Sequence, residues 1–586
     1  MVRKVLAVWG LVLLLGFAAR TGVGAEKLPP AARWVPHEAV LVVEVAKPKA
    51  VLDAILDPAL IERVTKIPAY KKAAAQPNFQ QGLGMVRFLE GQLGTDWKSA
   101  LHGLFDGGIA WGIEPNGGTV LMVDAQDEKL LAKLHETLLT ITKADAAGKG
   151  DPDRVKSEEY RGVTCWSIGN DEAHAILGNR LILTNKPSTL KKVLDIRAAE
   201  DAKGVAGLPA YQAARQAAGP GAAATVFVNL AEIKRHVPVD KALAEQNNNP
   251  VGALLFAGML ETVRQSSWLA MGLKIDGTTL SLEMASDGKT SGAGGAAAFT
   301  APGQPGDGAL PGLSVPRSIA SLSLYRDLHG FYAAKDKLFP ERTSGLIFFE
   351  NMMGIFFSGR DFTEEVLAQA KPQIRFVVAG QKYDPAVGTP QVQIPAFAAI
   401  FRVRNPKEFA EVMEEAWQKA IGLVSFTSGQ KGEGGLIIGH GTHNGTPVTA
   451  AHFSTTGLDK TRLGMQFNFR PALVKLGDYL VLSSTEGLAR DLIDAIKKEM
   501  DEQVKTIAGT HSLLQFDLGQ LATVLGANRA AMVRQNMLDK GAKLEEAEGQ
   551  IDVILAILKY AGRAELNMAN RDGQARARLQ VKLNPD

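Results

Sequence analysis

The fold of this chain is decided by a hairpin-like segment that occurs twice: Gly178-Asn179-Arg180-Leu181-Ile182-Leu183-Thr184 in the first half, and Gly477-Asp478-Tyr479-Leu480-Val481-Leu482-Ser483 in the second. In each copy a glycine stands next to Asn or Asp, a pair that tolerates the positive φ of a tight hairpin turn. The apolar run that follows is typical of a buried strand. Each half of the chain is therefore predicted to contain the same hairpin.

Four more landmarks recur in the same order around this segment. They pair Val35-Pro36 with Val315-Pro316, Asp96-Trp97 with Asp361-Phe362, Val228-Asn229-Leu230 with Phe516-Asp517-Leu518, and Asp276-Gly277 with Asp572-Gly573. The spacing between the copies drifts, as loop insertions and deletions produce in a duplicated unit, whereas chance matches would not keep their order. We therefore predict an internal duplication.

A change in composition marks the junction between the two copies. Residues 287–312 are rich in Gly, Ala and Pro and hold almost no large apolar side chain, so we expect them to form a flexible linker. This places the first repeat unit at residues 26–286 and the second at residues 313–586. Each unit is long enough to bury a hydrophobic core.

Strand-like and helix-like patterns alternate in both units. The buried-strand pattern of residues 119–123 precedes a helix with Leu130 and Leu134 on one face, and residues 398–403 precede a helix that begins near Pro406. Hairpins are predicted at residues 173–184, 269–284 and 465–483. The predicted fold class is α+β, in which each unit has a mainly antiparallel sheet with helices packed on one face.

The N-terminal 25 residues have the features of a signal peptide. Arg3 and Lys4 precede the apolar stretch of residues 5–19, and Val23-Gly24-Ala25 supplies the small residues of a cleavage site. The apolar stretch is shorter than the roughly 20 residues that span a bilayer, which favours cleavage after Ala25 over a retained anchor. We expect export to the periplasm, the cell envelope or the extracellular space, with no transmembrane span in the cleaved chain.

The charge balance excludes one class of function. The sequence has 65 Lys and Arg against 62 Asp and Glu, and removal of Arg3, Lys4 and Arg20 with the signal peptide leaves equal numbers. Nucleic-acid-binding proteins usually carry a basic excess, because phosphate neutralisation supplies most of their affinity. We therefore expect no nucleic-acid partner.

These features together resemble a known class of exported proteins. The signal peptide, the Pro-led strand that begins at Val35-Pro36 and the repeated hairpins are similar to those of large exported bacterial proteins that carry a domain of unknown function. The resemblance spans most of both copies. It implies an exported protein with this fold, and it brings no activity, cofactor or catalytic residue.

Three histidines are the candidates for a metal site. His440, His443 and His452 lie close together in the sequence of the second unit, and clustered neutral imidazoles are ligands for zinc or copper. The alternative is that they are solvated hairpin residues. Residues 432–447 are rich in glycine, and the equivalent residues 160–163 of the first unit include no histidine.

No catalytic residue or cofactor is predicted. The chain lacks the Gly-x-Ser-x-Gly motif of a nucleophile elbow, and Gly288-Lys289-Thr290 follows Glu283 where a phosphate-binding loop requires glycine. The single cysteine, Cys165, lies in a strand-like run, so we expect a small core residue in preference to a nucleophile.

An apolar helix supplies the candidates for a binding surface. Residues 346–357 are apolar on nearly every side of a helix, and a helix of this kind must be buried somewhere. It packs either on its own sheet or against a lipid or a partner helix. The counterpart in the first unit, residues 79–93, is far more polar, which favours a contact specific to the second unit. The apolar-contact candidates are Phe348, Phe349, Met352, Met353, Phe356 and Phe357.

The sequence therefore predicts an exported, non-catalytic binding or scaffolding protein, whose partner is an unknown protein or an apolar ligand. Two linked copies of one unit raise the apparent affinity for a partner that both copies bind. Two alternatives stay open: a metal-dependent hydrolase that uses the second unit, and a carrier of an apolar ligand. An enzyme requires polar groups that converge in one cleft, whereas a carrier requires an enclosed apolar cavity.

Overall fold

The computed structural model divides the chain into two compact units. The structure describes residues 28–66, 70–71, 74–199, 204–238, 249–289, 295–430, 434–454, 459, 463–571 and 574–584. The predicted signal peptide lies outside these residues. The first unit consists of Met1–Val239 and Gln265–Gly288, and the second consists mainly of Asp240–Arg264 and Lys289–Asn584.

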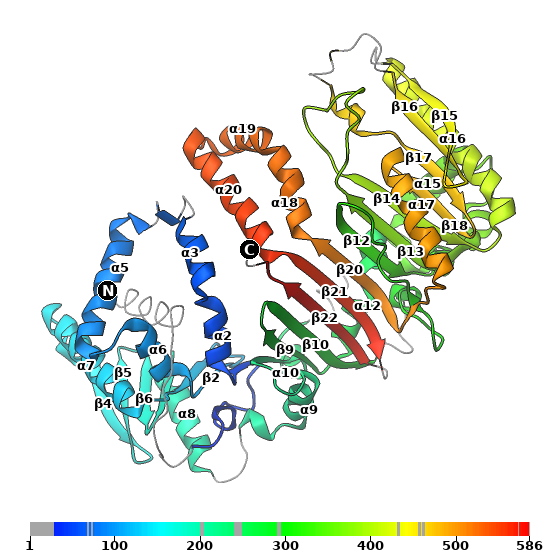
Figure 1. Ribbon diagram of the computed structural model, residues 1–586. Coiled ribbons are helices and arrows are strands. Elements are labelled where there is room, and N and C mark those ends of the chain that lie inside the picture. Colours follow the sequence, from blue (N-terminus) through cyan, green and yellow to red (C-terminus); the bar gives the residue numbers. More distant parts are fainter. Residues whose placement is uncertain are drawn as a thin grey trace. The chain divides into compact units, whose positions relative to one another are not determined.

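The first unit is built on an antiparallel sheet with the strand order β10-β9-β8-β1-β2-β3-β7-β6-β5-β4 (Figure 1). The bounds of these strands are β1 Leu41–Val45, β2 Gly108–Ile113, β3 Thr119–Asp124, β4 Val155–Tyr160, β5 Val163–Ile168, β6 Ala173–Leu177, β7 Arg180–Thr184, β8 Ala224–Asn229, β9 Trp268–Asp276 and β10 Thr279–Lys289. The predicted hairpins at residues 173–184 and 269–284 are the pairs β6–β7 and β9–β10.

The second unit repeats this order strand for strand, as β22-β21-β20-β12-β13-β14-β18-β17-β16-β15. The bounds are β12 Ser318–Tyr325, β13 Ala370–Ala379, β14 Ala396–Val403, β15 Leu436–His443, β16 Thr446–Phe453, β17 Ala472–Leu476, β18 Tyr479–Ser483, β20 Thr510–Asp517, β21 Arg563–Arg571 and β22 Gln574–Lys582. Even the register of the decisive hairpin is shared, since Leu177 pairs with Arg180 and Leu476 with Tyr479. The duplication predicted from the sequence is therefore present in the fold.

Helices cover both faces of each sheet, whereas one covered face was predicted. On β7, Leu181 packs in a core with α6 and α7, and the next residue, Ile182, packs on the opposite face in a core with α8 and α9. On β18, Leu480 and Val481 divide in the same way between α16 and α17. Strands buried on two faces are apolar at consecutive positions, which is the pattern of the repeated segment.

Helices lie between the strands of both units, and the number of described helices differs between the two. In the first unit they are α2 Pro48–Ile55, α3 Pro58–Lys66, α5 Pro77–Leu93, α6 Trp97–Phe105, α7 Glu128–Gly148, α8 Pro187–Ala198, α9 Pro209–Ala217 and α10 Leu230–His236. In the second unit they are α12 Pro250–Gln265, α13 Leu328–Ala333, α14 Lys335–Leu338, α15 Thr343–Phe356, α16 Pro406–Gln430, α17 Glu486–Asp501, α18 Leu518–Ala527, α19 Arg529–Lys540 and α20 Leu544–Ala561.

Two of the repeated sequence landmarks are helix starts. Asp96 accepts hydrogen bonds from backbone N–H groups at the start of α6, and Asp361 does the same for the helical turn Phe362–Val366. Asn229 and Asp517 cap α10 and α18. A carboxylate or amide oxygen at this position satisfies backbone donors that have no partner within the helix, which explains why these residue types recur.

The predicted linker is ordered in part, and the predicted unit boundary is displaced. Residues Gly295–Phe299 form a short helix in which Ala296 and Ala297 are buried, and Gly308–Ala309 (β11) pairs with Ile507–Ala508 (β19). Helix α12, which lies within the predicted first unit, belongs to the second, where Ala253 and Ala257 pack near Phe331. Alanine side chains are small enough to bring backbones together, so a segment without large apolar residues still packs here.

Candidate functional site

One side of helix α15 is anchored to the second unit by aromatic contacts. The ring of Phe349 meets that of Phe362 at 5.5 Å between centroids, and Phe357, just after the helix, meets Phe362 at 6.1 Å. Tyr332 packs on Phe362 at 5.4 Å, and its burial raises its pKa to about 12. These rings hold α15 against the helical turn that Asp361 caps.

The opposite side of α15 is an exposed apolar surface, which we call the outer apolar face. The structure describes every residue of α15, and none of them is fully buried. Phe348 is 70% exposed and Ile355 is 69% exposed, with Ile347 and Met352 also exposed. Phe348, Met352 and Ile355 lie three or four residues apart, so they share one side of the helix, and Ile347 borders that side. The outer apolar face consists of Ile347, Phe348, Met352 and Ile355.

The six predicted contact residues are therefore split between the two sides of α15. Phe348 and Met352 face outward, whereas Phe349 and Phe357 belong to the aromatic anchor, and Met353 and Phe356 are half-buried. Sequence reasoning missed Ile347 and Ile355. The helical period counted from Phe348 would have found Ile355, because the two residues are seven positions apart.

A second group of exposed apolar residues lies where α16 meets β15. The backbone N–H of Leu436 donates to Ser425 Oγ at 3.0 Å, so the start of β15 lies directly against the end of α16. We call the exposed apolar residues at this junction the edge cluster. They are Leu423, Val424 and Phe426 on α16, and Ile437 and Ile438 on β15.

The predicted histidine site is not assembled. His440 and His443 are three residues apart on β15, so they point to opposite faces of the sheet. His452 pairs with Ile437, six positions along the strand from His443, which is about 20 Å at ~3.3 Å per residue. In the described part of the chain, no group of three or more His, Cys, Asp or Glu residues is placed to hold a metal ion.

His443 has a different environment, which the first unit repeats. Its Nε2 lies 2.9 Å from a carboxylate oxygen of Asp494 on α17, and this contact lowers the pKa of Asp494. In the first unit, the Tyr160 hydroxyl donates to Asp195 on α8 at 2.9 Å, and Arg161 Nε donates to the same oxygen at 2.9 Å. In both units the last residue of the strand before a tight turn thus contacts an aspartate on a helix.

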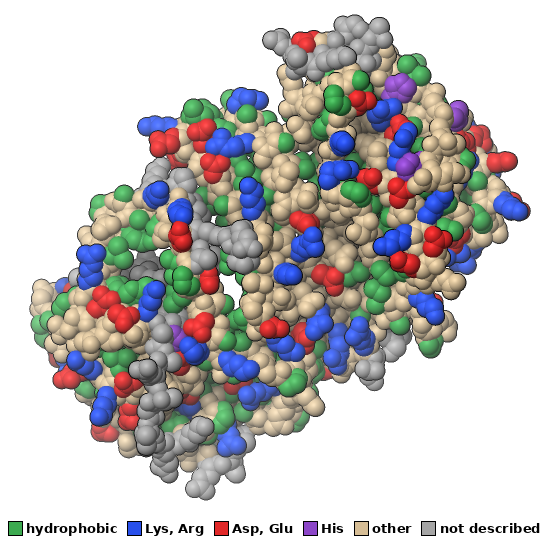
Figure 2. Space-filling view, viewed as in Figure 1, with side chains coloured by type: hydrophobic (Ala, Val, Ile, Leu, Met, Phe, Trp, Pro, Cys, Tyr) green, Lys and Arg blue, Asp and Glu red, His purple; other side chains and the backbone are tan. Residues whose placement is uncertain are grey.

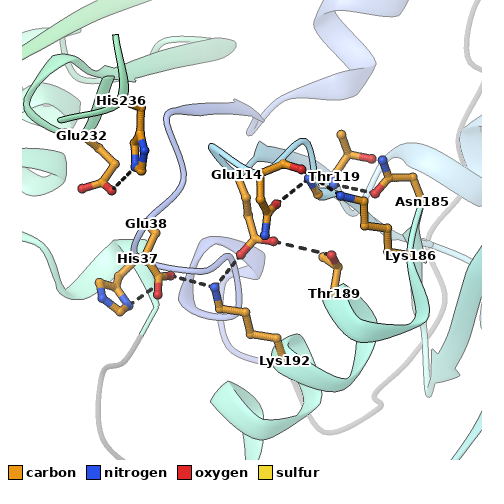
Figure 3. Close-up of polar contacts among 12 residues, drawn as sticks. His37, Glu38, Glu114, Thr119, Asn185, Lys186, Thr189, Lys192, Glu232 and His236 are labelled. Atoms are coloured by element: carbon orange, nitrogen blue, oxygen red, sulfur yellow. Dashed lines mark hydrogen bonds and ion pairs between the residues drawn. The ribbon is translucent and has the colours of Figure 1, made fainter. Parts of the chain in front are cut away.

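The first unit contains a cluster of charged groups, drawn in Figure 3. Lys192 Nζ on α8 lies 2.6 Å from Glu114 and 3.1 Å from Glu38. Burial opposes the charge of Lys192, but the hydrogen bonds to the two carboxylates raise its pKa overall. Glu114, only 4% exposed, lies in the turn between β2 and β3, and Lys186 donates to the carbonyl of Asn116 in that turn at 2.8 Å. The cluster fastens the β2–β3 turn to α8, which is a structural role.

A buried histidine, His174, meets a half-buried histidine, His135, in the first unit. His135 Nε2 on α7 lies 3.1 Å from His174 Nε2 on β6, and burial lowers the pKa of His174 to about 4, with a further contribution from His135. Both rings are therefore neutral near pH 7, and one donates a hydrogen bond to the other. Sequence reasoning missed this pair. The sequence held one signal for it: His174 lies in an apolar strand, and His135 lies next to the apolar residue Leu134 of a predicted helix.

Cys165 is a buried core residue, as the sequence predicts. It lies on β5 among apolar neighbours, and its burial raises the pKa of the thiol. A protonated thiol is a poor nucleophile. Figure 2 shows Lys and Arg interspersed with Asp and Glu over the visible surface, without a large area of one sign. No described helix is both long and apolar enough to cross a membrane.

Comparison with known proteins gives little beyond these observations. No family model matches the chain, and neither does any curated protein. Solved structures of TP0453 in crystal forms I, III and IV align with TM-scores of 0.23, 0.23 and 0.22 and sequence identities of 10%, 8% and 8%. The alignments cover 46%, 45% and 43% of this chain and 81%, 80% and 79% of the other. TM-scores this low support no inference about function.

Proposed function

We propose that this chain is an exported, non-catalytic binding protein of the bacterial envelope or periplasm, whose second unit binds an apolar segment of a partner protein. One observation carries the proposal: α15 exposes four large apolar side chains on one face while its other side is anchored by aromatic rings. Exposed contiguous apolar residues of this kind mark interaction sites in soluble proteins. The predicted signal peptide and the resemblance to exported bacterial proteins support the location.

The charges around α15 favour a protein partner over an anionic lipid surface. Arg342 and Arg360 flank the helix, but Glu341 precedes Arg342 and a carboxylate oxygen of Glu415 lies 3.8 Å from Arg360, so the rim carries both signs. An anionic membrane is attracted by a cluster of basic residues, which this rim lacks. Apolar side chains three or four residues apart are, in contrast, the pattern by which one amphipathic helix binds another.

Substitution of the outer apolar face tests the proposal. We expect the double variant Phe348→Asp with Ile355→Asp to lose most of the fluorescence of a polarity-sensitive dye bound to the native protein. The matched control is Phe88→Asp on α5, which removes an exposed phenylalanine from the equivalent helix and should leave the signal nearly unchanged. A native protein that binds no more dye than an ordinary globular protein contradicts the proposal.

Two further measurements separate this proposal from its alternatives. Binding of the native protein to anionic lipid vesicles, with loss in the double variant, would replace the protein partner by a membrane surface. A lipid extracted in stoichiometric amount from the purified protein would favour the carrier of an apolar ligand. The metal-dependent hydrolase has no support from the geometry, because its three histidines are separated along β15 and β16.

A further inference from the structure

One face of the second sheet carries buried polar side chains without hydrogen-bond partners. Ser323 on β12 lies opposite Arg375 on β13, so the two point to the same face, and Ser321 shares that face two residues along β12. Ser323 is 0% exposed, Arg375 1% and Ser321 3%. In the described part of the chain, Oγ of both serines and Nε of Arg375 have no hydrogen-bond partner. Buried polar groups in native proteins are almost always hydrogen-bonded, so these three atoms indicate an absent ligand or absent waters.

The first unit covers the equivalent position with a helix. Glu44 on β1 lies opposite Ala110, as Ser323 lies opposite Arg375. Helix α9 packs on this face of the first sheet, and the Tyr211 hydroxyl of α9 donates a hydrogen bond to the Glu44 carboxylate. The second unit has no described α-helix between α17 and β20, which is where α9 lies in the first repeat. The second unit therefore lacks the helix that supplies this polar partner.

A backbone segment covers the face instead of a helix. We call residues 308–315 the strap, in which Leu310 and Leu313 are buried in a core with α17. Gly312 of the strap lies over the polar groups, because a Cβ added there would overlap Gln515 Oε1 and lie 3.1 Å from Ser321 Oγ. The strap thus buries the serine hydroxyls without forming hydrogen bonds to them.

The polar side chains continue from the strap toward a more exposed part of the sheet. Gln515 on β20 lies opposite Ser321, and Glu565 on β21 lies opposite Gln515. Gln515 Nε2 donates to Glu565 at 2.8 Å, and Asn567 follows on the same face of β21. These three residues are half-buried. The polar face consists of Ser321, Ser323, Arg375, Gln515, Glu565 and Asn567.

The charges on the polar face favour a neutral ligand. Arg375 donates to both carboxylate oxygens of Glu499, at 2.7 Å and 3.1 Å, so its charge is already compensated. Glu565 adds a carboxylate, which repels an anion. Each serine hydroxyl can both donate and accept a hydrogen bond, whereas Nε of Arg375 can only donate. A neutral molecule with several hydroxyl groups offers partners for all three atoms.

We propose that the polar face binds a neutral polyhydroxylated molecule, of the chemical class of the sugars, between the strap and the strands β12, β20 and β21. One end of the ligand forms hydrogen bonds with Ser321, Ser323 and Nε of Arg375, and the half-buried amide and carboxylate groups bind its other hydroxyls. The strap shifts outward to admit the ligand, and the hydrogen bonds that the three buried atoms gain favour that shift. This site is separate from the outer apolar face and does not depend on the proposed function.

Substitution of Ser323 tests the site in the full chain. We expect calorimetric titration with glycerol, glucose and N-acetylglucosamine to detect binding of at least one of them, and Ser323→Ala to weaken it at least about fivefold, because one hydrogen bond is lost. Without ligand, Ser323→Ala should raise the melting temperature of the second unit, because a buried hydroxyl without a partner is removed. The matched control is Ser318→Ala, on the opposite face of the same strand, which should leave the affinity unchanged.

The other outcomes overturn the proposal. A wild type that binds none of the three probes, together with a lower melting temperature for Ser323→Ala, would show that buried waters satisfy the hydroxyls. Binding of sulfate in preference to the three probes would make the ligand an anion. Equal binding by Ser323→Ala and the wild type, or loss of binding in Phe348→Asp with Ile355→Asp, would place the ligand elsewhere on the chain.

Discussion

The two units place a helix at the same point of the repeat, between its first and second strands, but pack it differently. In the first unit, α5 buries Leu89 and packs Met85 and Leu93 against the core formed with α6 and α7. In the second unit, α15 has no fully buried residue and exposes Phe348 and Ile355. The strands around the two helices keep the same order. The two units thus share the order of their strands and the residues that cap their helices, which folding requires. The packing of α5 and α15 differs between them.

The largest loss of stability confined to one unit should come from substitution of Arg326. This residue follows β12, whereas Ala46 follows the equivalent strand β1. Its guanidinium is buried without a carboxylate and donates to the carbonyl oxygens of Leu254 at 2.6 Å and His511 at 2.8 Å. Burial lowers its pKa to about 10, so it is still charged at pH 7. We expect Arg326→Met to destabilise the second unit by about 3–5 kcal/mol, because buried carbonyl groups lose their donor.

Calorimetry measures this effect as a shift of one unfolding transition with the transition of the first unit unchanged. The exposed Arg342→Met is the matched control and should leave both transitions in place. Equal shifts of both transitions for Arg326→Met would show that the two units do not unfold separately.

One truncation in each helix tests whether α5 is buried and α15 is exposed. Leu89→Ala removes a buried side chain from α5 and should cost about 2–4 kcal/mol, because a cavity remains in the core. Phe348→Ala removes a side chain that is 70% exposed and should change the free energy of unfolding by no more than about 0.5 kcal/mol. Urea unfolding of both variants gives the two values. A loss for Phe348→Ala as large as that for Leu89→Ala would mean that α15 is covered within its own chain.

Much of the fold could be predicted because the signals were local. Consecutive apolar residues such as Leu181 and Ile182 mark a strand, and their recurrence at Leu480 and Val481 marks the repeat. The covering layers were predicted incorrectly, since hairpin connections suggested a sheet with one exposed face. The same apolar runs indicate that both faces are covered, because a strand with one exposed face alternates between apolar and polar residues.

The candidate site could be predicted only in part, because burial depends on distant partners. The apolar character of α15 is visible in the sequence. Which side of the helix is covered depends on Phe362, which packs on Phe349 and lies outside the helix. The three histidines are close in sequence and separate in space, because a hairpin distributes neighbouring residues over two faces. His135 and His174 show the reverse case, since residues 39 positions apart meet through the packing of α7 on β6.

One histidine with a lowered pKa in each unit gives that unit its own dependence on pH. In the folded first unit the pKa of His174 is about 4, below the ordinary value of 6.5, so the unfolded chain takes up the proton first as the pH falls. The stability of the first unit should therefore be complete above pH 6.5 and fall by about 2–3 kcal/mol between pH 6.5 and pH 4. In the second unit burial lowers the pKa of His511 to about 3, with a further contribution from Arg326.

Substitution of His174 should separate the two units. We expect His174→Leu to flatten the acid dependence of the first transition and leave that of the second unchanged, as urea unfolding at pH 7 and pH 5 measures. An unchanged slope for the first transition in the variant would assign the acid sensitivity to other groups.

The smallest expected effect concerns the hairpin contacts that the two units share. Tyr160→Phe removes a hydrogen bond to Asp195, and His443→Ala removes the contact with Asp494. Both aspartates are partly exposed, so each change should cost only about 0.5–1 kcal/mol in its own unit. Urea unfolding should give similar small losses in the free energy of unfolding for both variants, and His443→Ala should have the same metal content as the wild type. This result would indicate that His443 has the same structural role as Tyr160. A stoichiometric metal that is present in the wild type and lost in His443→Ala, but kept in Tyr160→Phe, would restore a metal role specific to the second unit.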